Sequence, residues 1–100
     1  MKNKGLILLE HIFESISLLN SYIEGKTKED FINSIQLQDS IIRRIQIIGE
    51  AIKIIPINIK NLNPKIPWRK IAAMRDLLIH QYFNVDLDLT WQVIIRTFRN

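Results

Sequence analysis

The sequence predicts an all-α protein, an up-and-down antiparallel helical bundle with four principal helices and one additional short helix. Hydrophobic residues make up 47% of the 100-residue chain. They recur at three- and four-residue spacing, which is the period of an amphipathic helix. Only three glycines and three prolines interrupt the chain, so its elements should be few and long. The length fits a single domain over residues 1–100.

The first helix is predicted from about Lys4 to Glu24, and Gly25 should end it. One apolar stripe runs along it: Leu6, Leu9, Ile12, Phe13, Ile16, Leu19 and Ile23. Thr27 then begins a segment typical of a capping box, because its hydroxyl can accept backbone N–H groups of a following turn. This segment should start the short helix, which carries Phe31.

The third helix is predicted from Ser34 or Gln36 to about Ile55, where Pro56 must end or kink it. It has two apolar stripes about 100° apart. The first is Ile41, Ile45, Ile48, Ile52 and Ile55, and the second is Ile47, Ala51 and Ile54. Such a helix either lies at the centre of its own bundle or buries one stripe against another chain. Gly49 indicates either a close backbone approach or a tolerated glycine, which costs about 1 kcal/mol relative to Ala.

Residues 57–65 are rich in asparagine and predict a loop with room for one helical turn. Pro67 suits the first turn of a fourth helix, which should reach about Tyr82 and lie with the third at the centre of the bundle. Residues 83–86 should break it. Asp86 or Asp88 can cap a last helix, whose apolar residues are Leu87, Trp91, Ile94, Ile95 and Phe98.

Composition excludes several classes of protein. The chain has no cysteine, which removes disulfides, thiolate nucleophiles and sulfur metal ligands and is compatible with the cytoplasm. Its only histidines are His11 and His80, and no carboxylates cluster at ligand spacing, so we expect no metal and no cofactor. His11 has the pattern of a partly exposed helix residue.

The distribution of charge favours a soluble protein with an anionic partner. Glu10 and His11 interrupt the apolar run that starts at Leu6, which leaves it too short for a secretory segment, and no stretch reaches the roughly 20 residues of a membrane span. We therefore expect a cytoplasmic protein without a membrane partner. The net charge of +4 tilts the choice of partner towards RNA, nucleotides or an acidic protein.

The chemically unusual residues lie together in the fourth helix, in the pattern Arg75-x4-His80-x-Tyr82. Arg75 and Tyr82 are seven residues apart and share a face, whereas Asp76 and His80 form an i,i+4 pair on another face. An unbent helix therefore cannot aim Arg75 and His80 at one point. A joint site needs either a helix that ends near His80 or a second copy related by a two-fold axis. Alternatively, these residues have no catalytic role. Arg75 would then be a surface cation, Asp76 and His80 a solvated helix pair, and Tyr82 an amphipathic residue at the edge of the bundle.

This motif resembles that of the HepT-like group of HEPN domains, which are small helical proteins. The resemblance extends over most of the chain through Gly49-Glu50-Ala51, Ile66-Pro67-Trp68, Tyr82-Phe83, Asp86 and Trp91. It implies a homodimeric ribonuclease toxin whose paired motifs line an interface cleft. It further implies a minimal nucleotidyltransferase as antitoxin, which adenylylates the motif tyrosine, here Tyr82.

We therefore expect a metal-independent endoribonuclease of a toxin–antitoxin pair. His80 would take the proton from the ribose 2′-OH, and Arg75 would stabilise the phosphorane. Asp76 would orient His80, and Tyr82 would be a substrate contact and the target of modification. The alternative is a non-enzymatic substrate-binding or regulatory subunit of a nucleotidyltransferase. The second apolar stripe of the third helix could serve either the homodimer or the antitoxin.

Overall fold

The computed structural model describes residues 3–81 and 86–98, apart from the side chains of 79–81, and within them it contains six α-helices and no strand. This confirms the all-α fold class. The four principal helices are joined by two short ones instead of one. The helices are α1 Lys4–Ile23, α2 Lys28–Ile32, α3 Ile35–Ile54, α4 Ile57–Leu62, α5 Trp68–Gln81 and α6 Leu87–Phe98.

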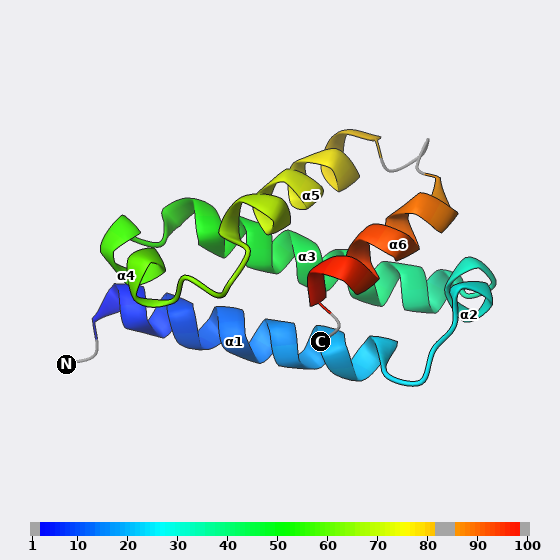
Figure 1. Ribbon diagram of the computed structural model, residues 1–100, viewed down its shortest axis with the longest axis horizontal. Helices are drawn as coiled ribbons and strands as arrows, with labels where there is room; N and C mark the ends of the chain where they lie inside the picture. The colour runs from blue at the N-terminus through cyan, green and yellow to red at the C-terminus, as the bar shows by residue number, and fades with distance from the viewer. Residues whose placement is uncertain (1–2, 82–85, 99–100) are drawn as a thin grey trace.

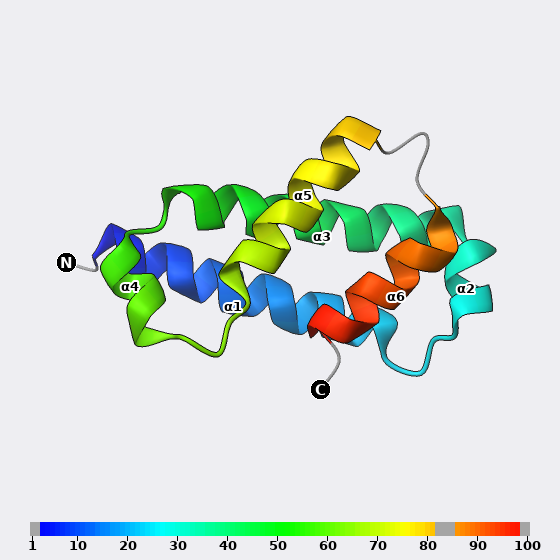
Figure 2. The same ribbon diagram turned by 45° about the horizontal axis from the view of Figure 1, so that its top comes forward.

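Helix α3 is the centre of the bundle, since it packs against α1, α2 and α5. It runs antiparallel to α1, while α2 and α4 close opposite ends of this pair (Figure 1). Helix α5 crosses α3, and α6 runs antiparallel to α5 in both views (Figure 2). Of the two helices expected at the centre, only α3 is surrounded. Helix α5 packs chiefly on α3, because its buried side chains form a single stripe: Ile71, Met74 and Leu78.

The core is built around the first apolar stripe of α3, all of whose predicted members are buried. Residues from every other helix pack on this stripe, among them Ile12, Leu19, Ile23, Phe31, Ile59, Ile71, Leu78, Trp91 and Ile94. Complete burial of one such apolar side chain stabilises a fold by roughly 1.5–3 kcal/mol. These side chains, most of them isoleucines, thus form one continuous core.

The predicted stripe of α1 is only partly buried. Ile12, Leu19 and Ile23 belong to the core, but Leu6 and Phe13 are exposed, because α3 covers only one side of this helix. Contrary to the sequence expectation, α1 is also long and apolar enough to cross a membrane by length and composition, a test that core helices of soluble proteins and signal sequences also pass.

The predicted caps set the helix boundaries. Gly25 has φ +72°, a left-handed conformation that disfavours side chains, and α1 ends just before it. The Thr27 hydroxyl accepts from the Asp30 N–H at 3.2 Å and the Asp30 carboxylate accepts from the Thr27 N–H at 2.8 Å, which completes the capping box of α2. Buried Gln38 donates from Nε2 to the Phe31 carbonyl at 2.9 Å, so α3 holds the end of α2 in place.

Residues 57–62 form the short helix α4 where a loop with one turn was expected, and buried Ile59 anchors it to the core. The indole Nε1 of Trp68 donates to the carbonyls of Lys60 and Asn63, at 3.2 and 3.1 Å. Trp68 therefore fixes the connection between α4 and α5.

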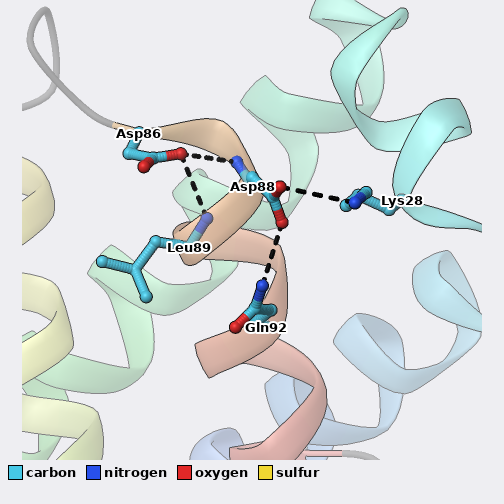
Figure 3. Close-up of polar contacts among 5 residues, drawn as sticks. All are labelled: Lys28, Asp86, Asp88, Leu89 and Gln92. Atoms are coloured by element: carbon cyan, nitrogen blue, oxygen red, sulfur yellow. Dashed lines mark hydrogen bonds and ion pairs between the residues drawn. The ribbon is translucent and has the colours of Figure 1, made fainter.

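Helix α6 begins at an aspartate cap and is tied to α2. The Asp86 Oδ1 atom accepts from the backbone N–H groups of Asp88 and Leu89, at 3.0 and 3.2 Å (Figure 3). Lys28 of α2 forms an ion pair with Asp88 at 3.3 Å. The ring centroids of Phe31 and Trp91 lie 5.3 Å apart, which adds an aromatic contact between the same two helices.

Candidate active site

Gly49 and Arg75 meet where α3 and α5 cross. A Cβ atom built on Gly49 would overlap the Cβ and Cγ atoms of Arg75. Only glycine leaves room for α5 at this separation, so the close backbone approach is confirmed and the tolerated-glycine alternative is excluded. The residue seated on the glycine is the motif arginine.

The Arg75 side chain is only 19% exposed and lies between two carboxylates. Its Nη1 atom donates to Asp76 Oδ1 at 2.9 Å, and its Nη2 atom forms an ion pair with Glu50 Oε1 at 3.7 Å. Its Nε atom is buried without a hydrogen-bond partner among the described residues. Arg75 is therefore held in one orientation and is no freely solvated surface cation.

Lys53 of α3 completes this group, which we call the Arg75 cluster: Glu50, Lys53, Arg75 and Asp76. Lys53 Nζ donates to Asp76 Oδ1 at 2.8 Å. The hydrogen bonds from Lys53 and, second, from Arg75 lower the pKa of the Asp76 carboxyl below its usual value. Asp76 is thus ionised at neutral pH, and the two positive charges in the cluster balance the two negative ones.

The other predicted site residues are described less fully. His80 lies within α5, which stays helical through Gln81, so the Cα atoms of Arg75 and His80 are about 140° apart around the helix axis. The side chain of His80 and the whole of Tyr82 lie outside the described residues. The orientation of His80 by Asp76 therefore stays a prediction, and the contacts described for Asp76 are to Lys53 and Arg75.

The structure brings Arg75 and Asp76 together and adds three residues of α3 that sequence reasoning did not assign: Gly49, Glu50 and Lys53. A signal for the first two was present in the mid-helix glycine and its acidic neighbour. The contact of Lys53 with Asp76 was not predictable, because it joins residues 23 positions apart in two helices.

Two of the surfaces with exposed apolar side chains lie on α3 and between α5 and α6. One is the outer face of α3, where Arg43, Ile47, Glu50 and Ile54 follow one another at helical spacing and Ile54 is 69% exposed. We call it the α3 outer face. The other is a groove of about 500 Å³ between α5 and α6, whose lining includes Leu77, Leu89 and Val93. Only the α3 outer face contains a member of the Arg75 cluster, Glu50.

The cluster can bind a phosphate but shows no arrangement for binding a metal. Arginine pairs with phosphate oxygens through its terminal nitrogens, and in Arg75 these nitrogens already contact carboxylates that are themselves partly or largely exposed. Across residues 3–81 and 86–98, apart from the side chains of 79–81, no three histidine, aspartate or glutamate side chains gather to hold a metal ion.

Comparison with known proteins gives consistent matches. A family model described as ribonuclease HepT-like matches residues 12–100. A probable ribonuclease HepT of Thermococcus cleftensis is 44% identical over 94% of this chain and 86% of its own length. A putative RNase of Caldanaerobacter subterraneus subsp. tengcongensis is 39% identical over 88% of this chain and 79% of its own.

A longer relative also matches. A protein of Methanocaldococcus jannaschii named as a gamma-glutamylcyclotransferase and putative RNase is 51% identical over 94% of this chain, which spans 42% of that protein's length. No solved structure matches the chain.

The fold and these matches define a HEPN-like helical domain. The chain belongs to the ribonuclease HepT-like family. The resemblance seen in the Arg75-x4-His80-x-Tyr82 motif is therefore confirmed, as is the expectation of an endoribonuclease at the level of the family.

Proposed function

We propose that the protein is a metal-independent endoribonuclease whose site contains Arg75 and His80. The observation that carries this proposal is the seating of Arg75 on Gly49, with its guanidinium held by Glu50 of α3 and Asp76 of α5. Gly49 makes room for the Cβ and Cγ atoms of Arg75, and this close approach of α5 to α3 brings the guanidinium to Glu50.

The chemistry follows from the two side chains. The His80 imidazole takes the proton from a ribose 2′-OH, which attacks the adjacent phosphate. Arg75 stabilises the negative charge that develops on the phosphorane, through its terminal nitrogens. The 5′-oxygen then leaves, and the upstream fragment ends in a 2′,3′-cyclic phosphate. Asp76 holds Arg75 in the structure, and its proposed second role is to orient His80.

We further propose a homodimer that joins two copies at the α3 outer face. Helix α5 is regular through Arg75 and His80, so in one protomer their Cα atoms lie on different sides of the helix axis. An antiparallel copy that places Arg43 opposite the partner's Glu50 brings the two Ile47 side chains together at the two-fold axis. Because Glu50 also contacts Arg75, this interface borders the catalytic cluster. A site shared by two protomers would result.

Regulation would act on the motif tyrosine. We propose that a cognate minimal nucleotidyltransferase, acting as the antitoxin in the cytoplasm, adenylylates Tyr82. Tyr82 follows Arg75 by seven residues, one helical repeat if α5 is extended to it. A phosphate attached to its phenol would pair with the Arg75 guanidinium and fill the position that the scissile phosphate requires.

The test of the activity is cleavage of RNA in the presence of EDTA. The wild type should cut RNA and leave cyclic phosphate ends, whereas His80→Ala should be inactive while keeping its helical content. Intact RNA after incubation with dimeric, unmodified wild type would reject the nuclease. It would favour the second candidate, a non-enzymatic subunit of the nucleotidyltransferase, whose supporting observation is the exposed apolar surface.

A further inference from the structure

We propose that Gly49 and Glu50 of α3 are positioning residues for Arg75, so that the catalytic guanidinium is placed by α3 as much as by its own helix. Gly49 sets how closely the Arg75 guanidinium approaches α3. Glu50 sets the direction in which the guanidinium points. This inference rests on the proposed function, in which Arg75 meets the scissile phosphate, and it assigns to these two residues a part in that reaction.

The depth of the guanidinium follows from the overlap at Gly49. The atoms that a new Cβ would meet include the Arg75 Cβ, which is fixed to the backbone and cannot rotate away. An alanine therefore moves the whole of α5 outwards, and the guanidinium moves with it. Gly5 of α1 is a milder case, because a Cβ there would lie 3.1 Å from Asn3 Oδ1 and Ile59 Cγ1 and 3.3 Å from Pro56 Cδ, which are close contacts and not overlaps.

The direction of the guanidinium follows from its three nitrogen atoms. Nε is buried against the helix crossing, while Nη1 donates to Asp76 at 2.9 Å. Glu50 attracts Nη2 from the opposite side, at 3.7 Å. Asp76 is the neighbour of Arg75 in sequence and moves with α5, so Glu50 is the only carboxylate of the Arg75 cluster that ties the guanidinium to α3.

The geometry at Glu50 also leaves Arg75 able to bind a phosphate. A separation of 3.7 Å is an ion pair and exceeds hydrogen-bond distance, so Glu50 does not occupy the hydrogens of Nη2. Glu50 is 59% exposed in the protomer, where water weakens its attraction for Arg75, and in the proposed dimer the partner's Arg43 competes for it. An incoming phosphate can therefore replace Glu50 without movement of α5.

The first test needs no enzymatic activity. Proton exchange with solvent is measured by NMR at the Nε–H groups of the six arginines, and the Arg75 signal is assigned by its absence in Arg75→Lys. In the wild type this signal should exchange slowly because Nε is buried. Gly49→Ala and Glu50→Gln should each accelerate its exchange by about tenfold or more.

Matched variants control for glycine replacement and for charge. Gly5→Ala makes the same replacement in α1, and Glu14→Gln changes the net charge as Glu50→Gln does, on an exposed site of α1. Neither should alter the Arg75 signal. Unchanged exchange at Arg75 in both Gly49→Ala and Glu50→Gln would overturn the proposal, and so would equal acceleration in the two controls. If Gly49→Ala does not fold, Glu50→Gln decides.

The second test measures RNA cleavage by folded protein. Displacement of a catalytic group by about 1 Å can cost 10²-fold, so Gly49→Ala should lower kcat by about a hundredfold with a smaller change in KM. Gly5→Ala should cleave like the wild type. Wild-type rates in Gly49→Ala would overturn the positioning role. A wild type that cleaves no RNA would instead reject the proposed function, and the exchange measurement would still decide whether α3 positions Arg75.

Discussion

Arg75 has to satisfy two conflicting requirements, because it must be fixed in place and must still bind a phosphate. Complete burial in a salt bridge would meet only the first, since a desolvated pair is costly to break. The structure instead gives Arg75 one short hydrogen bond, to Asp76, and one longer ion pair, to Glu50. Both carboxylates are partly exposed, which leaves the terminal nitrogens within reach of a ligand.

Asp76→Asn should destabilise the fold at neutral pH but not at low pH. Lys53, and then Arg75, lower the pKa of the folded carboxyl below 3.8, so the unfolded chain binds the proton more readily. The stabilisation is therefore present above about pH 4 and is lost as the pH falls through the folded pKa. Urea unfolding of both proteins in steps from about pH 7 to pH 2 should show this convergence. Equal stability at neutral pH would contradict the contacts of Asp76.

Tyr82→Phe should keep RNA cleavage and escape the antitoxin. Phenylalanine retains the ring but has no hydroxyl to accept a nucleotide. Co-expression with the cognate nucleotidyltransferase and intact-mass measurement should show whole AMP units on the wild type and none on the variant. An added mass that persists in Tyr82→Phe would move the modification to another residue.

The residues of the site differed in how well their roles could be predicted from the sequence. Arg75 was recognisable from its motif, and Gly49 was visible as an unusual glycine with two possible explanations. Their contact was not predictable, because the depth at which α5 crosses α3 depends on the packing of both helices. The contact of Lys53 with Asp76 was not predictable for the same reason, and in the sequence Lys53 resembles any solvated lysine.

At the level of elements, local chemistry determined the helix boundaries. Gly25, Ser34, Pro56 and Asp86 lie at or next to helix ends in the structure, as their backbone and capping preferences predict. Exposure was less predictable. Leu6 and Phe13 fit the apolar stripe of α1 but remain exposed, because periodicity gives the direction of a side chain and not the width of the surface that covers it.

Thr27→Ala should destabilise the protein by about 1 kcal/mol, the usual cost of losing an N-terminal helix cap. Helix α2 has only five residues, too few to form alone, so the capping box and the burial of Phe31 hold it in place. Urea unfolding measures the effect. Ser21→Ala removes an exposed hydroxyl that bonds only within α1 and should change stability by less than about 0.5 kcal/mol. Equal effects of the two variants would contradict the role of the cap.

At the scale of the whole molecule, Ile54→Glu should convert a dimer into a monomer, because it replaces an apolar side chain of the α3 outer face with a charged carboxylate that the proposed interface would have to cover. Ile54 is exposed in the protomer, so the variant should still fold. Leu77→Glu is the matched change in the groove between α5 and α6, where Leu77 is 51% exposed, and it should leave the dimer intact. Light scattering at micromolar concentration distinguishes them. Dissociation by Leu77→Glu alone would move the interface to the groove.

The central claim is that Arg75 and His80 act together in a site shared by two protomers, and mixing two inactive variants tests it most directly. Arg75→Ala and His80→Ala should each fail to cleave RNA in EDTA while remaining dimeric. After co-expression, half of the dimers should be mixed and each should contain one complete site, which restores about a quarter of the wild-type activity. Mixed dimers that stay inactive beside an active wild type would contradict the shared site.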